Sequence, residues 1–240
     1  MQRYFSEIKN GDYFELKKDD IRHIKTVMRM NDNDNIEVVY NENVYLCCLE
    51  NVKENIKIKI KKEQEKSKKI TPEMTLIIPL LKENKIDLIL QKSTEMGVDK
   101  ILLTPMERSI IRLEDKKTDK KIDRWNRICK EASEQSMRTT IPKIELLSSL
   151  KEVANLDGLN LICSTVERKN SIKKELLSLK KKSNYDKINL VIGPEGGISP
   201  NEEEFLVSSG YKRITLGNYI MRVETVPMFL MSIINYEFME

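Results

Sequence analysis

One short stretch constrains the fold more than any other: residues 190–205 read LVIGPEGGISPNEEEF. Its first three letters, LVI, are typical of a buried strand. Ser199, Pro200 and Glu202 have the spacing of a helix start, as N-cap, first helical residue and capping-box partner. Gly193–Gly197 is therefore predicted to be a strand-to-helix turn. In an open α/β sheet such turns lie at the carboxyl ends of strands, where ligands bind.

The sequence of this turn argues against a phosphate site, although glycines near a helix N-terminus often let backbone N–H groups converge on an anion. There is no GK[ST] sequence, the glycines do not fit G-x-G-x-x-G, and Glu195 places a carboxylate where a polyphosphate would lie. A neutral or cationic ligand suits the turn better. The alternative is a tight turn whose glycines only supply positive φ.

A second glycine turn lies in ITLGNYIMRVET, residues 214–225. It has the same construction: a strand, Gly217 at its end, a loop, and a helix that begins at Glu224 or Thr225. We expect the two strands to be neighbours and their turns to form two walls of one pocket. The loop mixes apolar side chains with one cation, Arg222, so it can hold a flat apolar ring and direct a charge at the chemistry.

The segments around these turns indicate two domains. From residue 74 onwards, strand-like and helix-like patterns alternate, which predicts a mainly parallel α/β sheet with helices on both faces. The preceding part holds short strand-like pieces separated by Asn, Asp and Gly turns, with one helical piece at 19–30. The charged letters EQEKSKK have the composition of a linker. We predict a small β-rich domain at 1–70 and an α/β domain at 71–240.

Composition excludes several classes of protein. The net charge of +4 does not by itself indicate nucleic acid, and the Lys-rich runs at 53–69 and 168–187 are either phosphate-facing or simply solvated. Because His23 is the only histidine, a Ser-His-Asp hydrolase or a multi-histidine metal site has little material. The 4 cysteines lack a C-x-x-C pair and indicate free thiols. No apolar segment reaches about 18 residues and the N-terminus lacks a signal-peptide core, so we expect a cytoplasmic protein with no membrane partner.

Five motifs follow one another in a specific order. They are RHIKTVMRM, LILQKSTEMGVDKILLTPMERS, WNRICKEASEQSMRTTIP, GPEGGIS and LGNYIMRVET. Together they resemble the RsmE family of SPOUT-class RNA methyltransferases, and the first is similar to that family's H-x-x-x-V-L-R signature. Members of this family methylate N3 of a uridine in small-subunit (16S) ribosomal RNA with S-adenosylmethionine. The likeness covers nearly the whole chain and implies the same activity here.

The resemblance also implies features that periodicity and spacing do not predict. It implies a SPOUT-type trefoil knot in the parallel sheet, formed by the last strands and loops and preceded by a small β-rich PUA-like domain. It further implies a homodimer that involves the apolar last helix. The expected substrate is small-subunit ribosomal RNA in an assembled subunit, and no metal is expected.

The resemblance places the cofactor against the two glycine turns. The glycines then let the backbone approach an adenosyl group, whose sulfonium is positive, so that a nearby carboxylate is no handicap. The implied cofactor-binding residues are Thr165, Ile192, Gly193, Glu195, Gly197, Leu216, Gly217, Ile220, Met221, Arg222 and Thr225.

Arg222 and Glu224 are the catalytic candidates. The family usually has Leu-Arg before a Thr-Glu-Thr-Ala run, whereas this chain has Met-Arg before Val-Glu-Thr-Val, which keeps both residues. The N3–H of uridine is a weakly acidic imide, so methylation needs proton loss and stabilisation of negative charge on the ring. Arg222 suits that second role. The alternatives for Arg222 are a salt bridge with Glu224 or an RNA-phosphate contact, and no general base is evident.

The remaining candidates are RNA contacts in the family-like motifs: His23, Arg29, Lys92, Arg108 and Arg138. A structural histidine and solvated cations are the alternatives. Other functions would use these features differently. A non-enzymatic RNA-binding protein needs the basic runs but not the paired glycine turns, and a nucleotide-binding oxidoreductase needs a different glycine sequence. A SPOUT enzyme with another RNA target would keep all of them.

Overall fold

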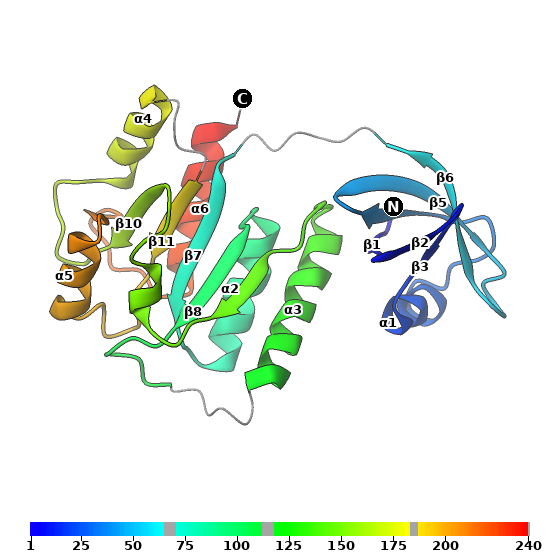
Figure 1. Ribbon diagram of the computed structural model, residues 1–240, viewed down its shortest axis with the longest axis horizontal. Helices are drawn as coiled ribbons and strands as arrows, with labels where there is room; N and C mark the ends of the chain where they lie inside the picture. Colours follow the sequence, from blue (N-terminus) through cyan, green and yellow to red (C-terminus); the bar gives the residue numbers. More distant parts are fainter. Residues whose placement is uncertain (65–70, 112–117, 183–186, 240) are drawn as a thin grey trace. The chain divides into compact units, whose positions relative to one another are not determined.

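The computed structural model describes residues 1–64, 71–111, 118–182 and 187–239, and the chain forms two compact units (Figure 1). The first unit contains Met1–Lys68 together with Lys130–Ile141, and the second contains Lys69–Cys129 and Pro142–Glu240. The domain boundary after residue 70 stays a prediction. No local pattern in the sequence indicates that residues 130–141 join the first unit.

The first unit is built on a six-stranded sheet with the order β1-β4-β5-β6-β3-β2. Only β1 and β4 pair in parallel; the other neighbours are antiparallel. Alternating side chains such as Ile36 and Val38 of β4 enter a core with Ile24. The first two strands, with three residues each, are too short to show a period in the sequence. The strands are β1 (Arg3–Phe5), β2 (Ile8–Asn10), β3 (Tyr13–Glu15), β4 (Asn35–Tyr40), β5 (Asn43–Glu50) and β6 (Lys57–Glu63).

The helical piece predicted at 19–30 is only partly regular. Helix α1 (Lys18–Arg22) passes directly into a π-helix, η1 (His23–Val27). The predicted helical piece is confirmed up to Val27 and does not extend over residues 28–30; hydrophobic spacing over one turn does not distinguish its α-helical part from its π-helical part. Arg29, just beyond it, has a φ of 51°. Both features are uncommon for ordinary residues, and π-helical turns often lie at functional sites.

The second unit contains a six-stranded sheet with the order β12-β10-β11-β7-β8-β9, and every neighbouring pair is parallel. The predicted α/β class with a parallel sheet is therefore confirmed. Consecutive residues of β7 from Met74 onwards are buried, so both faces of the sheet are covered. The strands are β7 (Glu73–Pro79), β8 (Lys100–Thr104), β9 (Lys143–Leu146), β10 (Leu159–Cys163), β11 (Lys187–Val191) and β12 (Lys212–Ile214).

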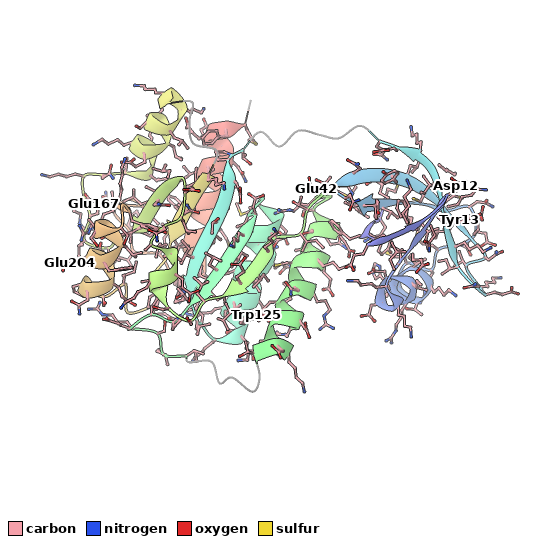
Figure 2. All side chains as sticks on the ribbon, in the orientation of Figure 1. Asp12, Tyr13, Glu42, Trp125, Glu167 and Glu204 are labelled. Atoms are coloured by element: carbon pink, nitrogen blue, oxygen red, sulfur yellow. The ribbon has the colours of Figure 1, made fainter. Side chains whose placement is uncertain are left out.

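Helices follow most of these strands, as the alternating pattern predicts. Leu206 of α5 and Val153 of η3 pack with Ile77 and Val191 on one face of the sheet. On α3, Trp125 is almost fully buried (Figure 2). No helix within the described ranges is long and apolar enough to cross a membrane. The helices are α2 (Glu83–Glu95), α3 (Thr118–Gln135), the 3-10 helix η3 (Leu150–Val153), α4 (Ile172–Lys182), α5 (Pro200–Ser208) and α6 (Thr225–Phe238).

The strand order corrects one expectation. β10 lies between β11 and β12, so the two glycine turns do not follow neighbouring strands, and that prediction was wrong. Local patterns indicate that a strand exists but not which strand lies beside it. The correction adds a third strand end between the two turns. The trefoil knot implied by the family resemblance stays a prediction.

Candidate active site

The turn after β11 has the local structure that its sequence predicts. Ser199 is the N-cap of α5: its Oγ accepts from the N–H of Glu202 at 3.2 Å, and the Glu202 carboxylate accepts from the N–H of Ser199 at 3.1 Å. Pro200 is the first helical residue. The predicted capping box is confirmed, and it fixes where the turn ends and the helix begins.

Gly193 is required by close packing inside this turn. A Cβ at Gly193 would lie 2.7 Å from Cγ1 and 2.8 Å from the backbone N of Ile198. Gly197, in contrast, has a φ of +73°, which side chains rarely allow. Glycine is therefore required at Gly193 by close packing and at Gly197 by the backbone conformation. Together the two glycines keep the turn narrow at the carboxyl end of β11.

The ends of β10, β11 and β12 and the start of α2 enclose one pocket of about 690 Å³. The strand ends of a parallel sheet meet at one edge, which explains why segments far apart in sequence converge here. The volume is that of a small-ligand site. The lining residues from the first two strand ends are Cys163, Ser164, Thr165, Arg168, Ile192, Gly193, Pro194, Glu195, Gly197 and Ile198. Those from the remaining segments are Lys85, Glu203, Thr215, Leu216, Gly217, Asn218, Tyr219, Ile220, Met221, Arg222, Val223, Glu224 and Val226.

The pocket brings the predicted residues together with one exception. The lining contains both catalytic candidates and all the predicted cofactor-binding residues apart from Thr225. Thr225 is exposed and is the first residue of α6. The roles of these residues stay predictions, but their convergence from three strand ends gives them a common site.

Lys85 provides a counter-charge for two carboxylates of the pocket. Its Nζ lies 2.8 Å from Oε1 of Glu195 and 3.5 Å from Oε2 of Glu224. The hydrogen bond from Lys85 lowers the pKa of the Glu195 carboxyl and raises the pKa of the Lys85 ammonium. Glu203, the third carboxylate, accepts from Nε of Arg213 at 2.9 Å. The carboxylates therefore face cations of the protein.

Arg222 is the cation of the pocket that is left unpaired. Among the described residues, no hydrogen bond or ion pair engages its guanidinium, and the side chain is exposed. Its carbonyl accepts from the N–H groups of Thr225 and Val226 at 2.9 and 3.2 Å, which fixes its backbone at the start of α6. The expected alternative, a salt bridge between Arg222 and Glu224, is not formed. A fixed backbone with a free guanidinium suits recognition of negative charge.

The loop after β10 forms a preorganised wall. The Oε1 atom of Glu167, labelled in Figure 2, accepts from the N–H groups of Arg168, Lys169 and Asn170 at 2.8, 2.7 and 3.1 Å. These bonds lower the pKa of the Glu167 carboxyl. Arg168 in turn donates from Nη1 to the carbonyls of Thr165 and Glu167 at 2.7 and 3.0 Å. The loop is thus held by its own hydrogen bonds.

Two large side chains on the opposite loop are exposed. Tyr219 and Ile220 line the pocket and are 88% and 85% exposed. Apolar groups gathered at the rim of a cavity favour a ligand or partner with a flat apolar part. Cys163 is half-buried in the pocket wall, and desolvation raises the pKa of its thiol. Within the described ranges, no three His, Cys, Asp or Glu residues gather as metal ligands.

The predicted RNA contacts occupy several environments. Nδ1 of His23 lies 3.0 Å from the hydroxyl of Tyr4. Arg29 is exposed beyond the π-helix, and Lys92 pairs with Glu95 on α2. The RNA-binding roles of these three residues stay predictions.

The two remaining arginines hold loops. Nη1 of Arg108 donates to the carbonyl of Gly196 at 2.9 Å and so supports the first glycine turn. Nε of Arg138 donates to the carbonyl of Thr140 at 3.2 Å. Contact of either residue with RNA would therefore also act on the loop that it holds.

Lys85 and Arg168 are two cations of the pocket that were not among the site residues predicted from the sequence. Lys85 lies at the start of α2, 110 residues before its partner Glu195, and no local pattern connects them. Arg168 was only counted within a Lys-rich run. Arg168 lies in the loop that follows the carboxyl end of β10. Because ligands bind at the carboxyl ends of strands in an open α/β sheet, this position could have indicated a site residue.

Gly193→Ala is expected to weaken binding of S-adenosylmethionine at least tenfold, because the added methyl group displaces the backbone of Ile198 and opens the turn. Calorimetric titration measures the affinity. Gly210→Ala is the matched control: Gly210 has a φ of +90°, lies outside the pocket and has no atom near the added Cβ. It should lose some stability but keep the affinity. Equal affinities of the wild type and Gly193→Ala would show that the turn does not contact the ligand.

Known proteins that are similar to this chain over nearly its whole length include ribosomal RNA methyltransferases. The protein named "Ribosomal RNA small subunit methyltransferase E" from Bacillus subtilis is 29% identical over 99% of this chain and 97% of its own length. The protein of the same name from Mesomycoplasma hyopneumoniae is 30% identical, over 97% of this chain and 98% of its own. The solved structure of that name from Neisseria gonorrhoeae, bound to S-adenosyl methionine, has the same fold: its TM-score is 0.84 at 24% identity, and the match covers 98% of this chain and 97% of that one.

Fold and pocket define a class of protein: a parallel α/β unit with a small-ligand site at the carboxyl edge of its sheet, accompanied by a β-rich unit. The RNA methyltransferase domain family matches residues 66–235, and the RNA methyltransferase PUA domain family matches residues 16–62. The chain belongs to the RsmE family of RNA methyltransferases, which confirms the family predicted from its motifs.

Proposed function

We propose that this protein is an S-adenosylmethionine-dependent methyltransferase that methylates N3 of a uridine in small-subunit (16S) ribosomal RNA. The observation that carries the proposal is one pocket that combines two glycine turns, exposed apolar side chains and the unpaired Arg222. Membership of the RsmE family and the names of the two curated relatives support ribosomal RNA as the substrate.

The chemistry of the pocket fits S-adenosylmethionine better than a polyphosphate. The narrow turn at Gly193 exposes backbone to a neutral ring, and Tyr219 and Ile220 offer apolar surface. The carboxylate of Glu195 lies on the turn and would repel a polyphosphate. Lys85 already pairs with the carboxylates of Glu195 and Glu224, so it does not offer a free cation to a phosphate. When bound, S-adenosylmethionine supplies an electrophilic methyl group on a positive sulfur.

The reaction removes one proton from N3 of uridine and transfers one methyl group from sulfur to that nitrogen. N3 of uridine would lose its proton to water, and the bond from N3 to the methyl carbon would form as the bond from that carbon to sulfur breaks, which would leave the sulfur as a neutral thioether. Negative charge develops on the uracil oxygens until the methyl group has transferred. Arg222 is the free cation of the pocket and stabilises this charge. Alignment of N3 with the methyl group at about 3–3.5 Å contributes further acceleration.

The proposal includes the partners of the enzyme. The proposed RNA contacts are the exposed Arg29, with His23 and Arg138, in the first unit, and Lys92 and Arg108 in the second. An assembled small subunit in the cytoplasm is the proposed form of the substrate.

A homodimer is the proposed oligomeric state. It is supported by α6, where Tyr236 stays 77% exposed although Leu230 and Ile234 of the same helix are buried.

Two measurements test the proposed function. Calorimetry with S-adenosylmethionine, ATP and NAD should show stoichiometric binding of the first alone, without added metal. Mapping of methylated nucleosides in ribosomal RNA by mass spectrometry should show that a deletion strain lacks one 3-methyluridine, which the plasmid-borne gene restores. Tight binding of ATP in competition with S-adenosylmethionine would overturn the cofactor, and an unchanged set of 3-methyluridines would overturn the reaction.

A further inference from the structure

The pocket contains carboxylates close to the cation that the proposed reaction needs. Glu224 is separated from Arg222 by a single residue, and both line the pocket. Because both side chains line the same pocket, the carboxylate is a potential partner for the guanidinium. The structure nevertheless leaves Arg222 without a partner, so something holds Glu224 elsewhere.

Lys85 is the group that faces Glu224. Its Nζ lies 3.5 Å from Oε2 of Glu224, and that oxygen is buried without a hydrogen-bond partner among the described residues. The Glu224 side chain is only 17% exposed, so water screens it little. The Lys85 ammonium therefore balances the charge of the Glu224 carboxylate.

Glu195 holds the lysine in this place. The Lys85–Glu195 hydrogen bond is 2.8 Å long, and it connects the first turn of α2 to the glycine turn after β11. With this bond the ammonium is anchored on one side and reaches Glu224 on the other. The three side chains thus join α2 with both glycine turns, which are the two walls of the pocket.

We propose that Lys85 is a positioning residue: it holds the Glu224 carboxylate and thereby keeps the Arg222 guanidinium free for the negative charge that develops on the substrate. The proposal rests on the function proposed above for Arg222. It makes the effect of Lys85 on Arg222 depend on the charge of Glu224, which the Lys85–Glu195 ion pair alone would not.

A double-mutant cycle tests this dependence. In the wild-type background, Lys85→Met should slow single-turnover methyl transfer about 10–100-fold, because Glu224 then pairs with Arg222. In a Glu224→Gln background, adding Lys85→Met should change the rate less than about threefold. Lys85→Arg should keep most of the rate, since it keeps the charge. All rates are measured at saturating S-adenosylmethionine, so that a change in its affinity does not enter the comparison.

Lys100→Met is the matched control. Lys100 pairs with Glu145 at 2.9 Å and its side chain is 28% exposed, against 26% for Lys85, but it lies outside the pocket. Its variant should transfer the methyl group at the wild-type rate. An equal loss of rate from Lys85→Met in both backgrounds, or no loss in either, overturns the proposal.

A readout without catalysis separates this proposal from the proposed function. In the ligand-free protein, phenylglyoxal should modify Arg222 readily, as measured by mass spectrometry of the tryptic peptide. Lys85→Met should slow this modification at least threefold, and Lys85→Met/Glu224→Gln should restore it. Failure of the methylation assays with this pattern intact would sink only the proposed function. An active wild type with unchanged Arg222 reactivity in Lys85→Met would sink only the role of Lys85. If Lys85→Met does not fold, Lys85→Gln takes its place in both tests.

Discussion

Arg222→Ala is expected to transfer the methyl group about 10²–10³-fold more slowly than the wild type, the loss typical of one donor that stabilises a developing anion. The reason is that Arg222 is the free cation of the pocket, whereas Lys85 is engaged by Glu195 and Glu224. Binding of S-adenosylmethionine and most of the RNA affinity should remain. Single-turnover transfer from labelled S-adenosylmethionine at saturating RNA measures the rate.

Two further variants sharpen the result. Arg222→Lys keeps the charge but loses the planar fork of the guanidinium, so an intermediate rate is expected. Arg124→Ala is the control: this arginine of α3 pairs with Asp87 outside the pocket and should not affect transfer.

The dependence on pH distinguishes chemistry from binding. At high pH more of the uridine imide has lost its proton without help, so the rate of Arg222→Ala should recover in part as the pH rises. A variant with a normal rate and a weakened RNA affinity would mean that Arg222 only holds the substrate.

Local features of the fold could be predicted because short-range interactions determine them. The capping box of Ser199 and Glu202 needs only four consecutive residues, and its atoms lie where the sequence pattern requires. The parallel sheet could be predicted because strands alternate with helices along the sequence, and because the strands are apolar enough to be buried on both faces. The start of α6 at Thr225 was one of the two positions expected.

Long-range features could not be predicted from the same rules. Nothing in the sequence around Gly193 shows that β10 lies between the two glycine turns. Glu195 illustrates the consequence for the site: from the sequence its charge is explained by the positive sulfonium of the cofactor, whereas in the structure Lys85 already compensates it. Pairing across 110 residues depends on the tertiary fold, which one sequence without an alignment does not reveal.

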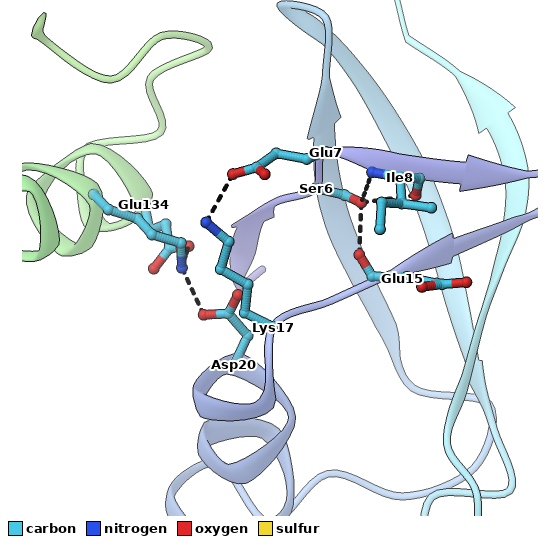
Figure 3. Close-up of polar contacts among 8 residues, drawn as sticks. Ser6, Glu7, Ile8, Glu15, Lys17, Asp20 and Glu134 are labelled. Atoms are coloured by element: carbon cyan, nitrogen blue, oxygen red, sulfur yellow. Dashed lines mark hydrogen bonds and ion pairs between the residues drawn. The ribbon is translucent and has the colours of Figure 1, made fainter.

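The membership of Lys130–Ile141 in the first unit is a further long-range feature. Lys130 continues the amphipathic pattern of α3, so its side chain would be assigned to solvent from spacing alone. Instead, its Nζ donates to Oδ1 of Asp20 at 2.5 Å and to Oε1 of Glu134 at 2.7 Å. Both carboxylate side chains are only 8% exposed. Figure 3 shows Asp20 of α1 and Glu134 of α3 facing each other across this contact.

Removing the ammonium should therefore destabilise the first unit strongly. Lys130→Met leaves two buried carboxylates without a counter-charge, and breaking such a group typically costs about 3–5 kcal/mol. The control lies in the same view: Lys17 pairs with Glu7 at 2.7 Å, but these side chains are 61% and 76% exposed (Figure 3). Water already solvates them, so Lys17→Met should lower the free energy of unfolding by about 0–1 kcal/mol.

The loss in Lys130→Met should depend on pH with a definite sign. Burial raises the pKa of the Glu134 carboxyl, while the bond from Lys130 lowers it, so removal of Lys130 raises this pKa further. A carboxyl whose pKa is higher in the folded than in the unfolded state stabilises the fold below its unfolded pKa, and this stabilisation is lost as the pH rises through the folded pKa. The deficit of Lys130→Met should thus be largest near pH 8 and smaller near pH 5. Native-state hydrogen exchange of the β4 and β5 amides reports the unfolding of this unit alone, and a deficit below about 1 kcal/mol at pH 8, or one equal at both pH values, would mean that the two carboxylates find other compensation.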